Sequence, residues 1–383
     1  MTELLILVAV VVAVIAIAQV VRIFELSNKI KGIRESDVTD KDNDTQGKLL
    51  LTFGILFMVA FFVMTAKWNH LLLPISASEH GLEIDFLMDL SMGLIIVVFL
   101  ITQPILFYLS FKYRGHKNRT ATFISHNDKA EIIWTIVPAV VLTVLIIYGL
   151  KTWASVMDRT NLDNPVVVEL YAKQFDWTAR YAGEDGQLGS ANVRFVGGLN
   201  SVGVIAESAL LTQNAGLQVN IEKTIAKIEA EENAMKRAKM EERLHKMQAK
   251  QKTFTSIVTR TAQDRLDAAE DDVVVKELHL PVNRQAHLKF RSQDVIHSAY
   301  FPHFRAQMNC VPGMNTDFVF KPILTTEEMR EETGNENFEY VLLCNKICGA
   351  AHFNMQMTVI VESEEDYEKW LASQATVLAS NNN

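Results

Sequence analysis

Four long uncharged apolar runs dominate the first 150 residues of the chain. They cover Leu4–Val21, Leu49–Ala66, Leu90–Phe111 and Ile132–Leu150. Each run contains 18 to 22 residues, close to the roughly 20 that a helix needs to cross the hydrocarbon core of a bilayer. The pattern therefore predicts four membrane-spanning helices and a lipid bilayer as a partner of the chain.

Positive charge is distributed unevenly among the loops that join these runs. The first loop contains six lysines and arginines and the third contains five, whereas the second contains only Lys67. Positively charged loops favour the cytoplasmic side, so the amino terminus and all residues after Leu150 are predicted on the outer face. We expect a multi-pass protein of a bacterial inner (plasma) membrane with a periplasmic carboxyl-terminal domain.

The first run could also be read as a signal peptide. A signal peptide begins with positive charge and has a shorter apolar core, whereas this chain begins with the acidic Glu3 and continues with 18 apolar or uncharged residues. These features favour a retained helix, and whether the run is cleaved stays open.

Beyond Leu150 the apolar positions change to the alternation of β-strands. Val166, Val168 and Leu170 alternate with other residues, and Met357, Val359 and Val361 do so near the end of the chain. An apolar residue at every second position is typical of a half-buried strand. The sequence therefore predicts a β domain after the membrane segment.

A helical pattern interrupts this β domain at about residues 187–272. Residues 221–266 contain no proline or glycine and are rich in Ala, Glu, Lys, Arg, Gln and Met, which are good helix formers. One long helix or a helical hairpin is expected here. Residues 321–338 are polar and acidic and are expected to form a surface loop, and residues 364–379 a short helix.

The predicted β domain is more acidic than the chain as a whole, whose formal net charge is -8. Residues 151–383 without the segment 222–265 carry 14 basic and 25 acidic side chains. Such a domain attracts a basic partner through long-range steering. We predict no nucleic-acid partner.

Metal-binding residue types gather in one short stretch near the carboxyl terminus. Cys344, Cys348, His352 and Met355 lie within twelve residues, although the chain has only three cysteines. Thiolate, thioether and imidazole ligands together select copper and are typical of electron-transfer sites. Two thiolates can bridge two copper ions, which leaves one histidine for each ion, and His297 can supply the second imidazole.

The run Asp-Val-Ile-His-Ser at 294–298, followed by Cys-x3-Cys-x3-His-x2-Met at 344–355, resembles subunit II of haem-copper cytochrome c oxidase. The resemblance implies a cupredoxin-like β-barrel that holds the dinuclear copper centre CuA. It implies the following ligand set: Cys344 and Cys348 bridging both coppers, His297 and His352 binding one copper each, Met355 as a weak axial ligand, and the backbone carbonyl of Lys346.

The chain departs from the family pattern at two of these motifs. Lys346 replaces a glutamate whose side chain helps to bind magnesium at the contact with subunit I, so that magnesium contact is not expected. Phe175, in the segment Gln174 to Trp177, replaces the tryptophan through which electrons enter in the family. Either Phe175 serves for electron entry or the donor docks differently. Trp177 is either part of that route or, as we favour, a core aromatic residue that packs under the copper-binding motif.

Residues 131–138 resemble the second membrane helix of the family, in which the position of Glu131 lies at the entrance of a proton channel. The resemblance assigns residues 86–150 to the family's membrane hairpin, 1–85 to two additional helices, 151–362 to the CuA domain, and 363–383 to a terminal helix and tail. No Cys-x-x-Cys-His motif occurs, so no covalent haem c is expected.

The resemblance implies a cytochrome c oxidase subunit in a respiratory chain. It would pass electrons from cytochrome c, or a cytochrome c domain, through CuA to haem in subunit I, where oxygen is reduced to water with proton translocation. Other oxidase subunits would be partners, and Asp176 and Asp294 are candidates for the donor-docking surface. The alternatives are a copper-free quinol oxidase subunit II and a membrane-anchored copper chaperone. Cys310, His279 and His303 are expected to be structural.

Overall fold

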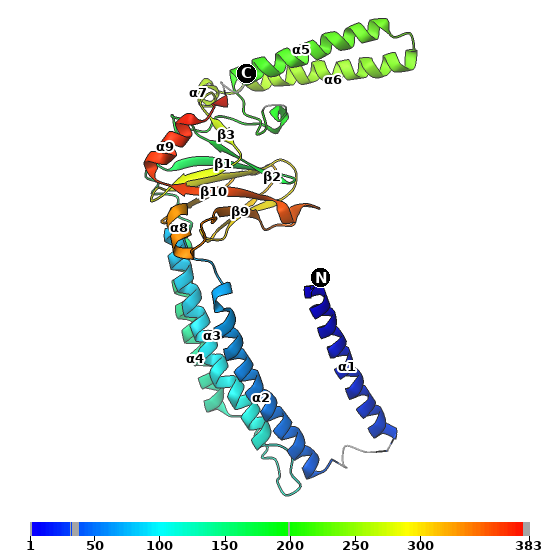
Figure 1. Cartoon of the computed structure of the whole chain (residues 1–383), viewed down its shortest axis with the longest axis vertical. Coiled ribbons are helices and arrows are strands. Elements are labelled where there is room, and N and C mark those ends of the chain that lie inside the picture. Colours follow the sequence, from blue (N-terminus) through cyan, green and yellow to red (C-terminus); the bar gives the residue numbers. More distant parts are fainter. Residues whose placement is uncertain (1, 31, 33–37, 198–199, 378–383) are drawn as a thin grey trace. The chain divides into compact units, whose positions relative to one another are not determined.

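The computed structural model describes residues 2–30, 32, 38–197 and 200–377 of the chain (Figure 1). Its internal contacts form two units. Met1–Leu72 and Met92–Val137 make up one, which we call the helical unit. Leu73–Ser91 and Pro138–Asn383 make up the other, which we call the β unit.

The four predicted apolar runs all lie in long helices. These are α1 (Thr2–Ile30), α2 (Asp40–Trp68), α3 (Glu79–Lys112) and α4 (Asp128–Val156). In the described part of the chain, α2 with the turn that follows it, α3 and α4 are long and apolar enough to cross a membrane. The chain is thus membrane-anchored. The first nine side chains of α1 lie outside the described residues, and membrane crossing by that helix stays a prediction.

Small residues allow α2 and α3 to approach closely within the helical unit. A Cβ atom added to Gly54 would lie 2.4 Å from the ring of Phe107, so no larger residue fits there without a shift. Such glycine contacts are a common way to bring membrane helices together. A capping box between Thr39 and Asp42 begins α2.

Two five-stranded sheets form the β unit. The first has the order β3-β2-β1-β5-β8 and the second β4-β10-β9-β6-β7. Their bounds are β1 Val166–Lys173, β2 Asp176–Tyr181, β3 Val273–Val275, β4 Leu278–Pro281, β5 Ala286–Ser292, β6 His297–Phe301, β7 Ala306–Cys310, β8 Thr316–Phe320, β9 Tyr340–Cys344 and β10 Gln356–Glu362.

Apolar side chains from both sheets share one buried core. Leu170 of β1, Leu288 of β5, Leu342 of β9 and Val359 of β10 are all fully buried in it. β1 pairs in parallel with β5, and β10 with β4, whereas the other pairs are antiparallel. The predicted fold class is confirmed, with helices followed by a cupredoxin-like β-barrel that a long helical insertion interrupts.

The insertion is a helical hairpin rather than one long helix. α5 (Glu207–Ala230) and α6 (Ala234–Val258) run side by side in opposite directions, and the short α7 (Gln263–Asp267) follows (Figure 1). The chain reverses just before Asn233, whose side chain accepts hydrogen bonds from the first backbone N–H groups of α6. At the base of the hairpin, Phe254 stacks on Phe195, with 4.6 Å between the ring centroids.

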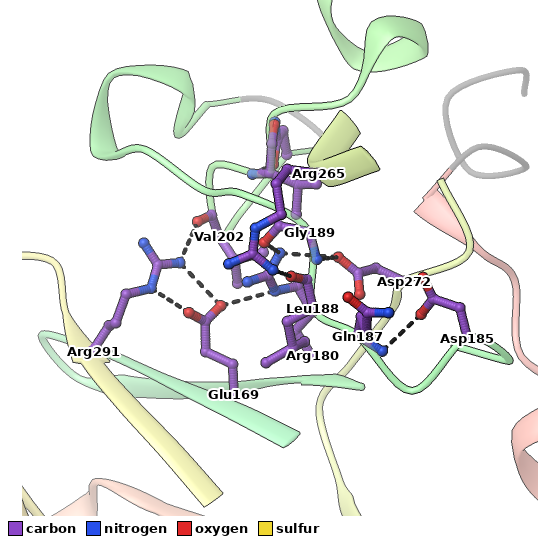
Figure 2. Close-up of polar contacts among 12 residues, drawn as sticks. Glu169, Arg180, Asp185, Gln187, Leu188, Gly189, Val202, Arg265, Asp272 and Arg291 are labelled. Carbon is purple, nitrogen blue, oxygen red and sulfur yellow. Dashed lines mark hydrogen bonds and ion pairs between the residues drawn. The ribbon is translucent and has the colours of Figure 1, made fainter. Parts of the chain in front are cut away.

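A buried ionic network joins the insertion to the first sheet. Arg180 of β2 donates from Nε to Glu169 of β1 at 2.8 Å and from Nη1 to Asp272 at 3.0 Å. Arg291 of β5 pairs with the same Glu169. Figure 2 shows Arg180 and Arg291 meeting at the carboxylate of Glu169, with Asp272 on the other side of Arg180. All of these side chains except Arg291, which is 16% exposed, are at least nine-tenths buried.

Backbone groups of the insertion complete the network. Arg180 donates to the carbonyl of Gly189 at 3.1 Å, and Arg291 donates to the carbonyl of Val202 at 2.9 Å (Figure 2). Burial raises the pKa of Asp272 to about 7, although Arg180 opposes the shift. Burial also acts to raise the pKa of Glu169, but Arg180 and Arg291 outweigh it and hold that pKa below its usual value.

The polar segment 321–338 is not simply a loop, because α8 (Thr326–Thr333) lies within it. Thr325 and Glu328 form a capping box, and Gly334 ends the helix in a left-handed conformation. Met329 of this helix is fully buried in the core of the β unit. The prediction of a surface loop was wrong because the polar composition concealed these capping signals. The last helix, α9 (Glu364–Ser373), was predicted but ends earlier than expected.

The segment between α2 and α3 is built into the β unit. Ala77 and Ser78 are fully buried there. The N–H of Ala77 donates to the carbonyl of His303 at 2.7 Å, and its carbonyl accepts from the N–H of Ile323 at 2.9 Å. Nearby, Arg305 forms an ion pair with Asp85 at 2.7 Å. We call residues 73–79 the strap.

Candidate metal centre

His297 is the first residue of β6 and is completely buried. Its Nε2 lies 2.9 Å from Oδ1 of Asp294, and its Nδ1 lies 3.9 Å from Sγ of Cys344. An imidazole that donates a hydrogen bond to a carboxylate from one nitrogen presents a lone pair on the other. The ring therefore presents Nδ1 toward the cysteine.

The other predicted ligands come from the end of β9 and the loop before β10. We call residues 345–355 the copper loop. Sγ of Cys344 lies 3.9 Å from Sγ of Cys348 and 3.3 Å from the carbonyl oxygen of Lys346. Sγ of Cys348 lies 3.5 Å from Nδ1 of His352 and 3.7 Å from Sδ of Met355. The fold thus brings all six predicted ligand atoms into one cluster.

These donors fit copper in number, kind and placement. The two cysteine sulfurs are almost twice as far apart as in a disulfide, about 2.05 Å, so both are available as separate ligands. His297, Cys344 and Cys348 are buried, and their ligand atoms lie within 4.8 Å of one another. Burial, followed by the neighbouring Cys344, raises the pKa of Cys348 to about 11. A soft cation between the sulfurs would offset that cost.

The turn between β1 and β2 lies against the copper loop. A Cβ atom on Gly349 would come within 2.8 Å of the ring of Phe175, so glycine permits this close approach. Phe175 is partly buried and packs on the core. Trp177 is 1% exposed, and its ring lies edge-to-face to that of His297, with 6.2 Å between the centroids. Trp177 therefore occupies a core position beside a predicted ligand.

The two candidate docking carboxylates have different surroundings. Asp294 accepts hydrogen bonds from the His297 ring and from the N–H groups of Gln174 and Val295. Burial acts to raise its pKa, but these hydrogen bonds outweigh burial and lower it. Asp176 is 42% exposed and pairs with Lys276 at 2.5 Å. A docking role for either residue stays a prediction.

Of the residues expected to be structural, Cys310 and His279 are buried and His303 is partly buried. Cys310, at the end of β7, has its thiol pKa raised to about 12 by burial. His279 bonds Glu362 at 2.8 Å and stacks on Trp370. Burial lowers the pKa of His303 to about 4, so its ring is neutral at ordinary pH. None of the three needs a catalytic explanation.

Glu131 lies in the first turn of α4, in the helical unit, with an exposed side chain. One carboxylate oxygen lies 3.4 Å from the N–H of Asn127. Such an acidic residue favourably faces the positive end of the helix dipole. Its role at a proton channel stays a prediction.

Sequence reasoning missed one residue of the site, Gln174. Its side-chain Nε2 donates to the carbonyl of Cys348 at 2.5 Å. Its position in the aromatic segment was visible in the sequence. No sequence signal reveals a contact between a turn and a loop that lie 174 residues apart in the chain.

Comparison with known proteins supports the resemblance. Residues 66–152 match the family model described as cytochrome C oxidase subunit II, transmembrane domain. The alternative cytochrome c oxidase subunit 2 of Bradyrhizobium diazoefficiens is 28% identical over 282 residues, covering 73% of this chain and 76% of that protein. Cytochrome c oxidase subunit 2 of Synechocystis is 22% identical over 313 residues, covering 80% and 77%.

Among solved structures, the periplasmic domain of subunit II of cytochrome oxidase (CoxB) from Bradyrhizobium japonicum matches 54% of this chain and 91% of its own length. The identity is 15% and the TM-score 0.27. The chain is therefore similar to cytochrome c oxidase subunit II, over residues 66–152 by the family model and over most of its length by the two relatives named above.

Proposed function

We propose that this chain is the electron-entry subunit of a respiratory terminal oxidase. It takes electrons from cytochrome c, or a cytochrome c domain, and passes them to haem in subunit I, where oxygen is reduced to water with proton translocation. The observation that carries the proposal is the convergence of two thiols, two imidazoles, a thioether and a carbonyl in one cluster, of which His297, Cys344, Cys348 and Met355 are buried. Oxygen chemistry belongs to subunit I.

The residues of this chain would hold a dinuclear copper centre. His297, Cys344, Cys348, His352, Met355 and the Lys346 carbonyl are its ligands. When bound, the copper pair would supply a one-electron redox couple, and Met355 and the side chains around the ligands would tune its potential.

The protein contributes rigidity to this site. His297 and Cys344 each lie in a strand of the second sheet, and Met355 directly precedes β10 and is 1% exposed. Buried ligands on paired strands move little when the charge of the site changes. A site that rearranges little favours fast electron transfer.

Electrons enter at Phe175, whose partly exposed ring packs against Gly349 beside the ligand Cys348. Asp176, next to it, contributes negative charge that attracts a basic donor. The exposed side chain of Lys346 offers no carboxylate for magnesium at the subunit I contact. Glu131 lies at the entrance of the proton channel.

The β unit faces the periplasm, anchored by the helices in a bacterial inner membrane. This placement follows from the distribution of positive charge in the loops. Subunit I and other oxidase subunits are the partners in the bilayer, and no covalent haem is carried by this chain.

Two other functions fit the observations less well. A quinol oxidase subunit II would not require copper ligands, yet all six ligand atoms cluster here. A copper chaperone would need the cysteines and one histidine but would not require both His352 and Met355 beside Cys348.

Metal analysis and electron paramagnetic resonance of the full-length chain, reconstituted with copper in detergent and oxidised, test the proposal. Two coppers per chain and a seven-line hyperfine pattern are expected. Cys344→Ser should abolish that pattern, whereas Cys310→Ser, which removes the one cysteine outside the cluster, should retain it. A single copper with four lines in the unsubstituted chain would contradict the proposal and favour the chaperone.

A further inference from the structure

Gln174 lies at the tip of the β1–β2 hairpin, between the two segments that provide the metal ligands. Its strand neighbours Lys173 and Asp176 pair with each other, so Gln174 and Phe175 form a two-residue turn. The turn is held near the His297 segment by the parallel pairing of β1 and β5. It reaches the copper loop with the side chain of Gln174.

Two groups of Gln174 bond in two directions. The side-chain amide donates to the carbonyl of Cys348 at 2.5 Å. The main-chain N–H donates to Oδ2 of Asp294 at 2.7 Å, and Oδ1 of Asp294 accepts from Nε2 of His297 at 2.9 Å. One residue thus connects a predicted ligand on the copper loop with a predicted ligand on β6.

The middle of the copper loop has few other ties to the protein. The backbone bonds His352 N–H to Gly349 carbonyl and Asn354 N–H to Ala351 carbonyl remain within the loop. Among the described residues, the Cys344 thiol of the adjoining β9 contacts Lys346 and Cys348, and the bond from Gln174 is the one hydrogen bond that joins loop residues 346–351 to an element beyond β9. A Cβ atom on Gly349 would come within 2.8 Å of the Gln174 amide nitrogen, so glycine keeps this approach open.

We propose that Gln174 is a positioning residue that holds Cys348 and His297 in register with each other. The inference rests on the proposed function for its purpose, because a shared metal needs both ligands at fixed separation. The side-chain bond of Gln174 to Cys348 and its main-chain bond to Asp294 can be tested separately. A side-chain substitution releases Cys348, whereas the main-chain bond to Asp294, and through it the orientation of His297, persists.

The side-chain half can be measured without any metal. An ordinary hydrogen bond corresponds to roughly a fivefold to tenfold change in a local opening equilibrium. Cys348 is 5% exposed, so its alkylation in the reduced, metal-free chain depends on such opening. In the full-length protein, Gln174→Met, which keeps the side-chain length but removes the donor, should raise the Cys348 alkylation rate by about that factor.

Three comparisons sharpen the experiment, which follows alkylation by mass spectrometry of each cysteine peptide. Gln174→Glu keeps the length and puts an acceptor against the Cys348 carbonyl, so Cys348 should react at least as fast as in Gln174→Met. Cys310, buried in β7, should be unchanged in both variants. Gln285→Ala removes another amide-to-carbonyl bond, from Nε2 to Asn161 at 3.4 Å, and should leave Cys348 unchanged.

An unchanged Cys348 rate in Gln174→Met, or a slow rate retained in Gln174→Glu, would overturn the positioning role. An equal rise at Cys310 would also overturn it, since the residue would then only support the whole fold. In the copper-loaded chain, both variants should lose copper to a chelator roughly tenfold faster. Because alkylation requires no copper, a chain that binds none would refute the proposed function and leave the alkylation result standing.

Discussion

The β unit buries two polar clusters of opposite character, the metal-ligand cluster and the ionic network of Glu169, Arg180, Asp272 and Arg291. The ionic network contains two arginines facing two carboxylates, so its charges are balanced by protein groups. The ligand cluster contains thiols, imidazoles and a thioether with no cationic side chain among them. In the network, Oδ1 of Asp272 is buried without a hydrogen-bond partner, but each carboxylate is paired with an arginine. In the proposed function, the ligand cluster gains its positive charge from a metal.

This difference suggests that the ionic network serves the stability of the β unit and that the ligand cluster serves metal binding. Removing one partner from a buried charge network strongly destabilises the domain, because the remaining charges stay buried without compensation. The ligand cluster consists of thiol, imidazole and thioether groups rather than of arginines paired with carboxylates. Substitutions in the first cluster should therefore act on folding and those in the second on metal binding.

The largest expected effect comes from Arg180→Met. It leaves Glu169 with only Arg291 and Asp272 with no cation, and should lower the free energy of unfolding by about 3–5 kcal/mol. Chemical denaturation of the full-length chain measures it. Lys246→Ala, which breaks an exposed pair with Glu242 on α6, is the control and should leave the free energy of unfolding almost unchanged, because solvent screens such a pair. Equal losses in the two variants would remove the contrast.

Asp294→Ala tests the other cluster. His297 loses the carboxylate that orients its ring, and copper affinity should fall by about 10- to 100-fold. Competition with a chelator of known affinity provides the measurement. The unfolding free energy of the metal-free chain should change far less than in Arg180→Met, and a comparable loss of stability would show that the two clusters are not functionally distinct.

The pH dependence of stability should report the raised pKa of Asp272. Its pKa is about 7 in the folded chain and about 3.9 when unfolded, so between these values the folded state holds a proton that the unfolded state has lost. This group therefore makes stability fall as pH rises from about 4 to about 7, by up to about 1.4 kcal/mol per pH unit. Asp272→Asn should remove that slope. Denaturation at pH 5 and pH 8 distinguishes the outcomes.

The smallest effect concerns the surface next to the ligand cluster. Asp176→Asn should lower the association rate with a basic cytochrome c roughly twofold at low ionic strength, and the difference should disappear in high salt. Stopped-flow kinetics measures both conditions. Lys276→Met, which removes the nearer of the two lysines paired with Asp176, should raise the association rate instead. Glu365→Gln on α9 serves as a control, and an unchanged rate in Asp176→Asn would exclude this docking site.

Sequence reasoning found the ligand cluster because most of it is local. Cys344 to Met355 form one loop with a diagnostic spacing, and His297 lies in a short recognisable run. The ionic network was not predictable, since its four residues come from separate strands and from the end of the insertion. Gln174 was missed for the same reason. The capping pair Thr325 and Glu328 was present in the sequence, but it was outweighed by polar composition.

The strap has a consequence for the order in which the protein is made. Ala77 bonds groups at positions 303 and 323, which leave the ribosome more than two hundred residues later. The β unit therefore completes its hydrogen bonds to the strap only after its carboxyl-terminal strands have been made, although the strap itself is made first. A truncated gene that begins after α4 would encode a β unit without the strap. The N–H of Ile323 and the carbonyl of His303 would then lose their hydrogen bonds to Ala77. Such a fragment should be harder to produce in folded form than one extended to include residues 73–91.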